Sequence, residues 1–128
     1  MKLLLDTHIL LWAAADMLPA RAEELLLDEG NVLFFSPASI WEIVIKNGLG
    51  RADFQADPRG LREGLLKNHY QELPITGEHA LAVKDLPRLH KDPFDRILLA
   101  QAVCENLTFL TCDKVLKEYP GSIIFVQP

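Results

Sequence analysis

Short apolar runs alternate along this chain with segments in which apolar residues recur at helical spacing. Four runs have the length and the unbroken apolar character of strands buried on both faces, and they lie at 2–6, 31–35, 107–111 and 122–126. A shorter strand is expected at 72–75, where Pro74 indicates an edge or a strand end. Helices are expected at 7–15, 19–30, 38–48, 57–70, 76–84 and 92–105. The alternation predicts an α/β sandwich whose mostly parallel central sheet is covered by helices on both faces.

Several of the expected helices have recognisable ends. A capping residue followed by proline precedes three of them, at Ser36-Pro37, Asp57-Pro58 and Asp92-Pro93. Gly30 and Gly48 stand where the helices at 19–30 and 38–48 are expected to close.

Length and composition indicate one soluble domain spanning residues 1–128. Hydrophobic residues make up 49% of the chain and charged residues 24%, which is ordinary for a globular protein. No segment approaches the run of about 20 apolar residues that a membrane helix needs. The N-terminus has a passing likeness to a secretion signal, but Asp6 and His8 interrupt its apolar core. We therefore expect a cytoplasmic protein with no membrane partner.

Cysteines and histidines do not form a visible metal-binding pattern. Cys104 and Cys112 fit neither a disulfide framework nor a four-ligand zinc site, and the four histidines are scattered along the chain. The net charge of −5 argues against a protein that grips nucleic acid mainly through a basic surface. It leaves open a protein that holds a phosphate through metal ions bound by its own acids.

Ligands of open parallel sheets bind beyond the carboxyl ends of the strands, so the residues that leave each strand are of interest. These residues are Asp6, Ser36, Thr76 and Thr111 with Asp113. Two of the four exits therefore carry carboxylates.

Four acids stand in apolar surroundings, unlike most of the 18 acidic residues: Asp6, Glu42, Asp95 and Asp113. Glu42 is the only charge in "SIWEIVI", so its carboxylate cannot lie far from buried surface and needs a cation. A pair with Lys46, one helical turn on, would satisfy it without any functional role.

The other three acids also have a structural interpretation. Asp6 is placed to cap the helix from Thr7, Asp113 to cap the segment that follows it, and Asp95 to complete a capping box with Asp92. These helix starts would meet at one edge of the sheet, where carboxylates repel one another. Hard divalent cations such as Mg²⁺ or Mn²⁺ would relieve that repulsion.

The segments "LLLDTHILLW", "ASIWEIVIK", "HKDPFDRILLAQA" and "FLTCDKVL" together resemble the PIN-domain nucleases, and most of all the VapC-type toxins of toxin–antitoxin pairs. The likeness runs from residue 2 to about residue 126, and "DPFDRILLAQA" is its most specific part. It implies a PIN-like three-layer sandwich.

The resemblance assigns roles residue by residue. Asp6, Glu42, Asp95 and Asp113 match the acidic quartet that binds metal and performs catalysis, and Thr111 matches a hydroxyl residue that supports the last acid. Asp6 and Asp95 are the expected main ligands, while Glu42 and Asp113 would bind a second metal or position the attacking water. Asp92 lies outside the quartet and keeps its cap role.

The implied activity is hydrolysis of RNA by a Mg²⁺- or Mn²⁺-activated water, leaving a 5′-phosphate and a 3′-hydroxyl. An aspartyl-phosphate phosphatase would need an aspartate where His8 stands. A PIN nuclease for RNA processing or for DNA stays open, as does a non-catalytic module that binds a partner.

The resemblance also implies partners, namely an RNA substrate, a small cognate antitoxin and a second copy of the chain. A docking surface for the antitoxin is expected on helices beside the site, formed by Trp12, Trp41, Leu11, Ile45 and Leu49. The same residues would equally suit the core or a homodimer contact.

Overall fold

The computed structural model describes residues 1–128 and is built around a sheet of five parallel strands in the order β3-β2-β1-β4-β5. The strands are β1 (Lys2–Leu5), β2 (Val32–Phe35), β3 (Gln71–Glu72), β4 (Thr108–Thr111) and β5 (Ile123–Phe125). β1 lies in the centre, so that both of its edges are hydrogen-bonded to neighbours. The parallel sheet expected from the sequence is confirmed.

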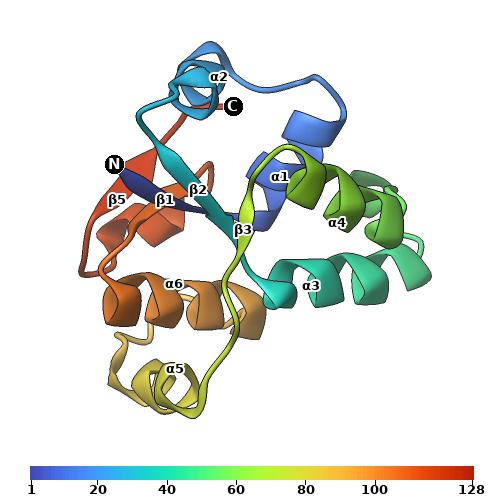
Figure 1. The fold of residues 1–128 in the computed structure, drawn as a ribbon. Helices are drawn as coiled ribbons and strands as arrows, with labels where there is room; N and C mark the ends of the chain where they lie inside the picture. Colours follow the sequence, from blue (N-terminus) through green and yellow to red (C-terminus); the bar gives the residue numbers. More distant parts are fainter.

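Six α-helices surround the sheet (Figure 1). Their bounds are α1 (Thr7–Ala14), α2 (Ala20–Leu27), α3 (Pro37–Gly48), α4 (Pro58–Lys67), α5 (Gly77–Ala82) and α6 (Pro93–Glu105). Short 3₁₀ turns are η1 (Ala52–Phe54), η2 (Val83–Asp85) and η3 (Lys114–Glu118). None of the helices has both the length and the apolar character that crossing a bilayer requires.

Alternate side chains of β1 enter two separate hydrophobic cores. Leu3 and Leu5 pack with residues of α1, α2 and α4, whereas Leu4 packs with residues of α6 on the other face. Helix α3 contributes Ile43 to the first core and Ala38 to the second. Figure 1 shows α5 and α6 on one side of the sheet and α1, α2 and α4 on the other. This confirms the three-layer sandwich.

The strand expected at 72–75 is shorter and displaced. β3 is the edge strand, as Pro74 indicated, but it ends at Glu72 because Pro74 has no N–H with which to extend the pairing. Leu73 makes the last contact, donating its N–H to the carbonyl of Phe35 at 2.8 Å. Thr76 is therefore the N-cap of α5 rather than a strand exit.

Several helix ends also differ from expectation, and α5 ends at Ala82 before the 3₁₀ turn η2 instead of running to Lys84. α2 ends at Leu27, and the N–H of Gly30 instead donates to the side chain of Asp28, so Gly30 does not close that helix. α4 stops at Lys67 rather than near Tyr70, because Tyr70 N–H bonds back to Leu65 and turns the chain toward β3.

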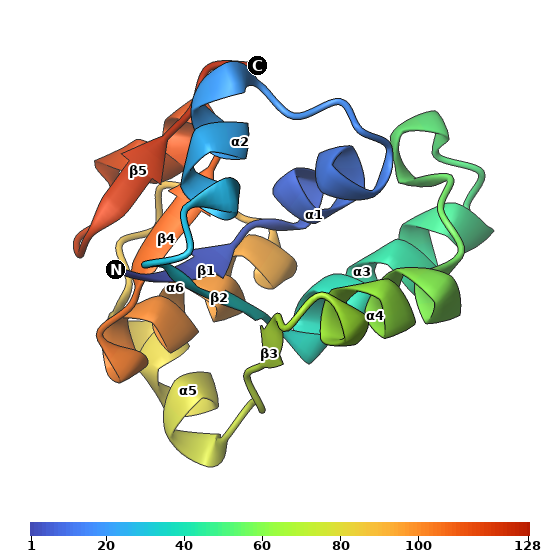
Figure 2. The ribbon, with the colours of Figure 1, turned by 45° about the horizontal axis from the view of Figure 1, so that its top comes forward.

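The carboxyl edge of the sheet is where the polar features gather. Asp6 leaves β1 and at once caps α1, while Asp113 follows β4 and caps η3. α3 begins directly after β2, and Figure 2 shows it lying beside α4 and extending away from the sheet. Because α6 leads back into β4, its N-terminus also reaches this edge.

Candidate active site

Asp6 is held in place by hydrogen bonds to both of its carboxylate oxygens. Oδ1 accepts the N–H of Thr7 at 2.7 Å, and Oδ2 accepts the hydroxyl of Thr111 at 2.6 Å. The side chain is buried at the end of β1. Burial raises the pKa of Asp6 to about 6, although these two hydrogen bonds act to lower it.

Thr111 connects the first and the last of the four acids. Its hydroxyl donates to Asp6, and the same oxygen accepts the backbone N–H of Asp113 at 3.0 Å. The expected support of the last acid is thus present, but it acts on the backbone of Asp113. The carboxylate that Thr111 binds is that of Asp6.

Glu42 lies on the buried side of α3 with partners for both oxygens. Oε1 accepts the hydroxyl of Thr7 at 2.6 Å, and Oε2 accepts Lys46 Nζ at 2.5 Å. The pair with Lys46 that the sequence suggested is therefore confirmed. Lys46 also reaches Asp92 at 3.3 Å. Burial alone would lower the pKa of Lys46, but its hydrogen bond to Glu42 and the nearby acids raise it above its ordinary value.

Asp92 is the N-cap of α6, as the sequence predicted. Its Oδ1 accepts the N–H of Phe94 at 2.8 Å and that of Asp95 at 3.4 Å. Asp95 does not complete a capping box, because the N–H of Asp92 donates to His90 Nδ1 at 3.3 Å. The carboxylate of Asp95 is free to face the other acids.

Asp95 is the point on which the acidic charges converge. Burial, and after it the charges of four acidic neighbours, together raise the pKa of Asp95 to about 8; the neighbours are Asp6, Asp92, Glu42 and Asp113. The structure thus brings together all four acids singled out in the sequence. Two groups that can balance them, Lys46 and His90, lie among them. Lys46 was expected beside Glu42, whereas His90 was not expected at the site.

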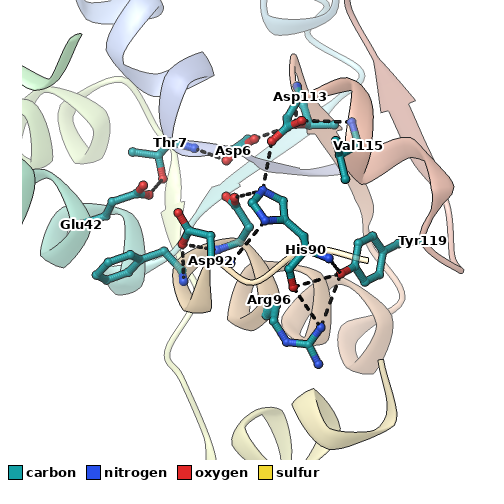
Figure 3. Close-up of polar contacts among 12 residues, drawn as sticks. Asp6, Thr7, Glu42, His90, Asp92, Arg96, Asp113, Val115 and Tyr119 are labelled. Atoms are coloured by element: carbon teal, nitrogen blue, oxygen red, sulfur yellow. Dashed lines mark hydrogen bonds and ion pairs between the residues drawn. The ribbon is translucent and has the colours of Figure 1, made fainter. Parts of the chain in front are cut away.

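His90 lies between two of the acids. Its Nε2 is 3.0 Å from Asp95 Oδ2 and 3.2 Å from Asp113 Oδ2. Figure 3 shows the contact between His90 and Asp113. Asp113 Oδ1 accepts the N–H of Val115 at 3.0 Å. One ligand atom each from His90, Asp95 and Asp113 lies within 4.8 Å of the others, a spacing that suits a metal ion. The scattered positions of the histidines in the sequence therefore did not exclude a histidine beside the acids. The only indication in the sequence was that His90 stands two residues before the Asp92 cap.

Arg96 holds the segment that carries His90. Its guanidinium donates to the carbonyl oxygens of Pro87 and Val83, both at 2.9 Å, and to that of His90 at 3.4 Å. The hydroxyl of Tyr119 accepts the N–H of His90 at 2.7 Å (Figure 3). The loop before α6 is thus fixed by side chains from α6 and from the residue that follows η3.

A large apolar groove lies elsewhere. It has a volume of about 750 Å³ between α1, α2 and α4, and apolar side chains such as Leu18, Leu26 and Leu65 line it. None of the four acids borders this groove. The chemistry available to the chain therefore belongs to the acidic cluster at the sheet edge.

The acids of this cluster both cap the segments that follow them and lie close to one another. Asp6 and Asp113 each use one oxygen for a backbone N–H and turn the other toward a side-chain donor. Carboxylate oxygens gathered in this way are the ligands that hard divalent cations prefer.

The sequence matches the family model of the PIN domain over residues 3–122. Solved structures with the same fold include VapBC2 from Rickettsia felis bound to promoter DNA, with a TM-score of 0.74 and 17% identity over 98% of both chains. DNA-bound VapBC from Salmonella typhimurium gives a TM-score of 0.70 with 15% identity, and a toxin–antitoxin complex from Klebsiella pneumoniae gives 0.64 with 19%, each over 98% of both chains. At these identities the structural likeness concerns the fold. Among proteins with curated descriptions, none matches this sequence.

Proposed function

Because this chain belongs to the PIN domain family, we propose that it is a Mg²⁺- or Mn²⁺-dependent endoribonuclease and the toxin of a toxin–antitoxin pair. The observation that supports this most is the environment of Asp95. Four further carboxylates surround it, and burial together with their charges raises its pKa to about 8. Repulsion among these carboxylates makes deprotonation of Asp95 unfavourable, and a divalent cation bound between them would remove that repulsion.

The donor set fits such an ion. Asp6, Asp95 and Asp113 offer the hard oxygen ligands that Mg²⁺ and Mn²⁺ prefer. Asp6 and Asp95 are the main ligands in this proposal, with Asp113 beside them and Glu42 at the margin. When bound, the cation would neutralise charge on the phosphate and lower the pKa of a water.

The chain itself orients these ligands. Thr111 and the N–H of Thr7 fix both oxygens of Asp6, so this carboxylate enters the site with a defined direction. The N–H of Val115 does the same for Asp113. Ligands held by hydrogen bonds from the protein need little reorganisation when an ion binds.

The surroundings of the acids suit a phosphodiester substrate. Lys91 and Lys114 are exposed and directly adjacent in sequence to Asp92 and Asp113. Their charges can contribute to phosphate binding next to the acids, although the chain as a whole is acidic with a net charge of −5. Binding at the scissile phosphate then depends on the metal rather than on a basic surface.

Fewer of the residues that the sequence suggested for an antitoxin surface are exposed. Leu11 is buried and Trp12 packs against the first core, so neither can anchor a partner. Trp41 and Ile45 are exposed on α3, and Leu49 is exposed at its C-cap. Trp41 also touches Phe94 at the start of α6, with ring centroids 5.2 Å apart, which places this surface beside the acids. We assign the antitoxin to this exposed face of α3, from which one of its basic side chains can pair with the acids.

Incubation of the purified protein with total cellular RNA tests the proposal. New fragments are expected with Mg²⁺ or Mn²⁺ and none with a chelator, and the new ends should carry 5′-phosphates. Fragments that persist in chelator, or that end in cyclic phosphates, would point to a different nuclease. Co-expression with the product of a small neighbouring gene tests the toxin role, since a stable complex should cleave little RNA until the antitoxin is digested away.

A further inference from the structure

Lys46 has an unusual position for a lysine, because its ammonium group is enclosed beside the acidic cluster. Only 17% of its side chain is exposed. Nζ lies 2.5 Å from Glu42 Oε2 and 3.3 Å from Asp92 Oδ2. A single cation therefore bridges α3 and the N-cap of α6, the helix that carries Asp95.

Aromatic rings form the walls around this ammonium group. Nζ lies 4.9 Å from the centroid of Phe54 and 5.7 Å from that of Phe94. Ring faces attract an ammonium group and keep water away from it. The two rings therefore favour the ammonium group of Lys46 at this position.

Glu42 is consequently occupied on both sides. Thr7 donates to one of its oxygens and Lys46 to the other. Both donors to Asp6 are neutral, whereas one of the donors to Glu42 is an ammonium group. A second divalent cation at Glu42 would therefore be repelled by Lys46. Asp95 differs, since neither a lysine nor an arginine contacts it and its side-chain partner is His90.

We propose that Lys46 takes the place of a second metal ion, so that the site holds one divalent cation on Asp6, Asp95 and Asp113. This inference rests on the proposed metal-dependent function. Lys46 acts here as a positioning residue. It fixes Glu42 and Asp92 relative to each other and supplies, from within the chain, the positive charge that a second ion would bring.

A titration with Mn²⁺ alone, followed by the paramagnetic resonance of free Mn²⁺ and by calorimetry, tests this on the full chain. The wild-type protein should bind one Mn²⁺ per chain. Lys46→Met removes the charge but keeps an apolar side chain against the two rings, so the freed Glu42 should allow a second Mn²⁺. Adding Glu42→Gln to Lys46→Met should restore a single bound ion.

Arg62→Met is the matched control. Arg62 of α4 pairs with Glu72 of β3 at 2.8 Å, so this variant also removes one cation from an ion pair. It should still bind one Mn²⁺. Two ions on the wild-type protein, or one ion on a folded Lys46→Met, would overturn the inference. Should Lys46→Met fail to fold, Lys46→Gln replaces it, with two bound Mn²⁺ expected and one bound Mn²⁺ overturning the inference. The wild-type protein should again bind one. Absence of Mn²⁺ binding in every variant would instead refute the proposed function itself, and this inference with it.

Discussion

His90 Nε2 lies 3.0 Å from Asp95 Oδ2, so an imidazole fills the space between Asp95 and Asp113. The N–H of Asp92 donates to Nδ1 of the same ring. A neutral ring that accepts at Nδ1 carries its proton on Nε2 and donates it to the acids. In the metal-free protein His90 therefore does part of what a cation would do.

Replacement of His90 by Ala should lower the stability of the metal-free protein by about 1–2 kcal/mol, since Asp95 and Asp113 lose a donor. The rise in melting temperature on adding Mn²⁺ should become larger, because the ion no longer competes with Nε2–H. Thermal melts with Mn²⁺ and with chelator measure both effects. A smaller metal-induced rise in the variant would show that His90 binds the ion instead of competing with it.

The two aspartates at the start of α6 should behave differently. Asp92→Ala removes the cap and should lower the free energy of unfolding by about 1–2 kcal/mol, with cleavage of RNA retained. Asp95→Asn should abolish cleavage without lowering the stability of the metal-free protein. Urea unfolding and an RNA cleavage assay measure these effects.

Asp57→Ala, which removes the cap of α4 far from the acids, is the control for Asp92→Ala. It should cost similar stability and leave cleavage unchanged. Loss of activity in Asp92→Ala together with an active Asp95→Asn would mean that the two roles are reversed.

The stability of the metal-free protein should fall as the pH rises from about 5 to about 9. The pKa of Asp95 is raised to about 8 and that of Asp6 to about 6 in the folded chain, each mainly by burial. Between their unfolded and folded pKa values the folded state binds more protons than the unfolded state. Stability present at low pH is therefore lost as the pH passes through the folded pKa values.

Chemical unfolding in chelator across this pH range measures the effect, and Asp95→Asn should flatten the fall. Saturating Mn²⁺ should oppose it, because the ion binds the deprotonated acids and its stabilisation grows with pH. An identical pH profile for wild type and Asp95→Asn would contradict the raised pKa of Asp95.

Arg96→Lys should loosen the loop before α6. A lysine cannot reproduce the set of hydrogen bonds that the guanidinium makes to the carbonyls of Val83, Pro87 and His90, so stability should fall by about 1–3 kcal/mol. Hydrogen exchange of residues 86–92 should accelerate more than that of the sheet. Uniform acceleration throughout the chain would indicate a general loss of stability without a specific role for Arg96.

Trp41→Ala should weaken antitoxin binding by at least about 2 kcal/mol, roughly thirtyfold in Kd, while free protein cleaves RNA as before. Leu81→Ala, an equally exposed apolar residue on α5, should leave the affinity unchanged. Calorimetry with the co-purified antitoxin measures both. Normal affinity in Trp41→Ala combined with loss in Leu27→Asp would move the partner to the groove between α1, α2 and α4.

The sequence predicted the sheet and the four acids because each depends on local patterns. Unbroken apolar runs mark buried parallel strands, and an isolated acid such as Glu42 within an apolar helix is visible without coordinates. Ser36, Asp57 and Asp92 were expected as caps, and all three side chains accept a backbone N–H.

The groups that balance the acids could not be predicted in the same way. His90 reaches Asp113, 23 positions away, only because Arg96 and Tyr119 fold its loop over the start of α6. Lys46 was foreseen as a partner of Glu42, but its contact with Asp92 crosses 46 positions. Such contacts depend on how helices pack, which spacing along one chain does not encode.

The rate of RNA cleavage by wild-type protein and by Asp95→Asn, with Mn²⁺ and with chelator, tests the central claim most directly. Asp57→Asn serves as a control that changes an acid outside the cluster. Wild type and Asp57→Asn should cleave RNA with Mn²⁺ alone, and Asp95→Asn should not cleave under either condition. Cleavage by Asp95→Asn at the wild-type rate would contradict a metal-dependent nuclease site at these acids.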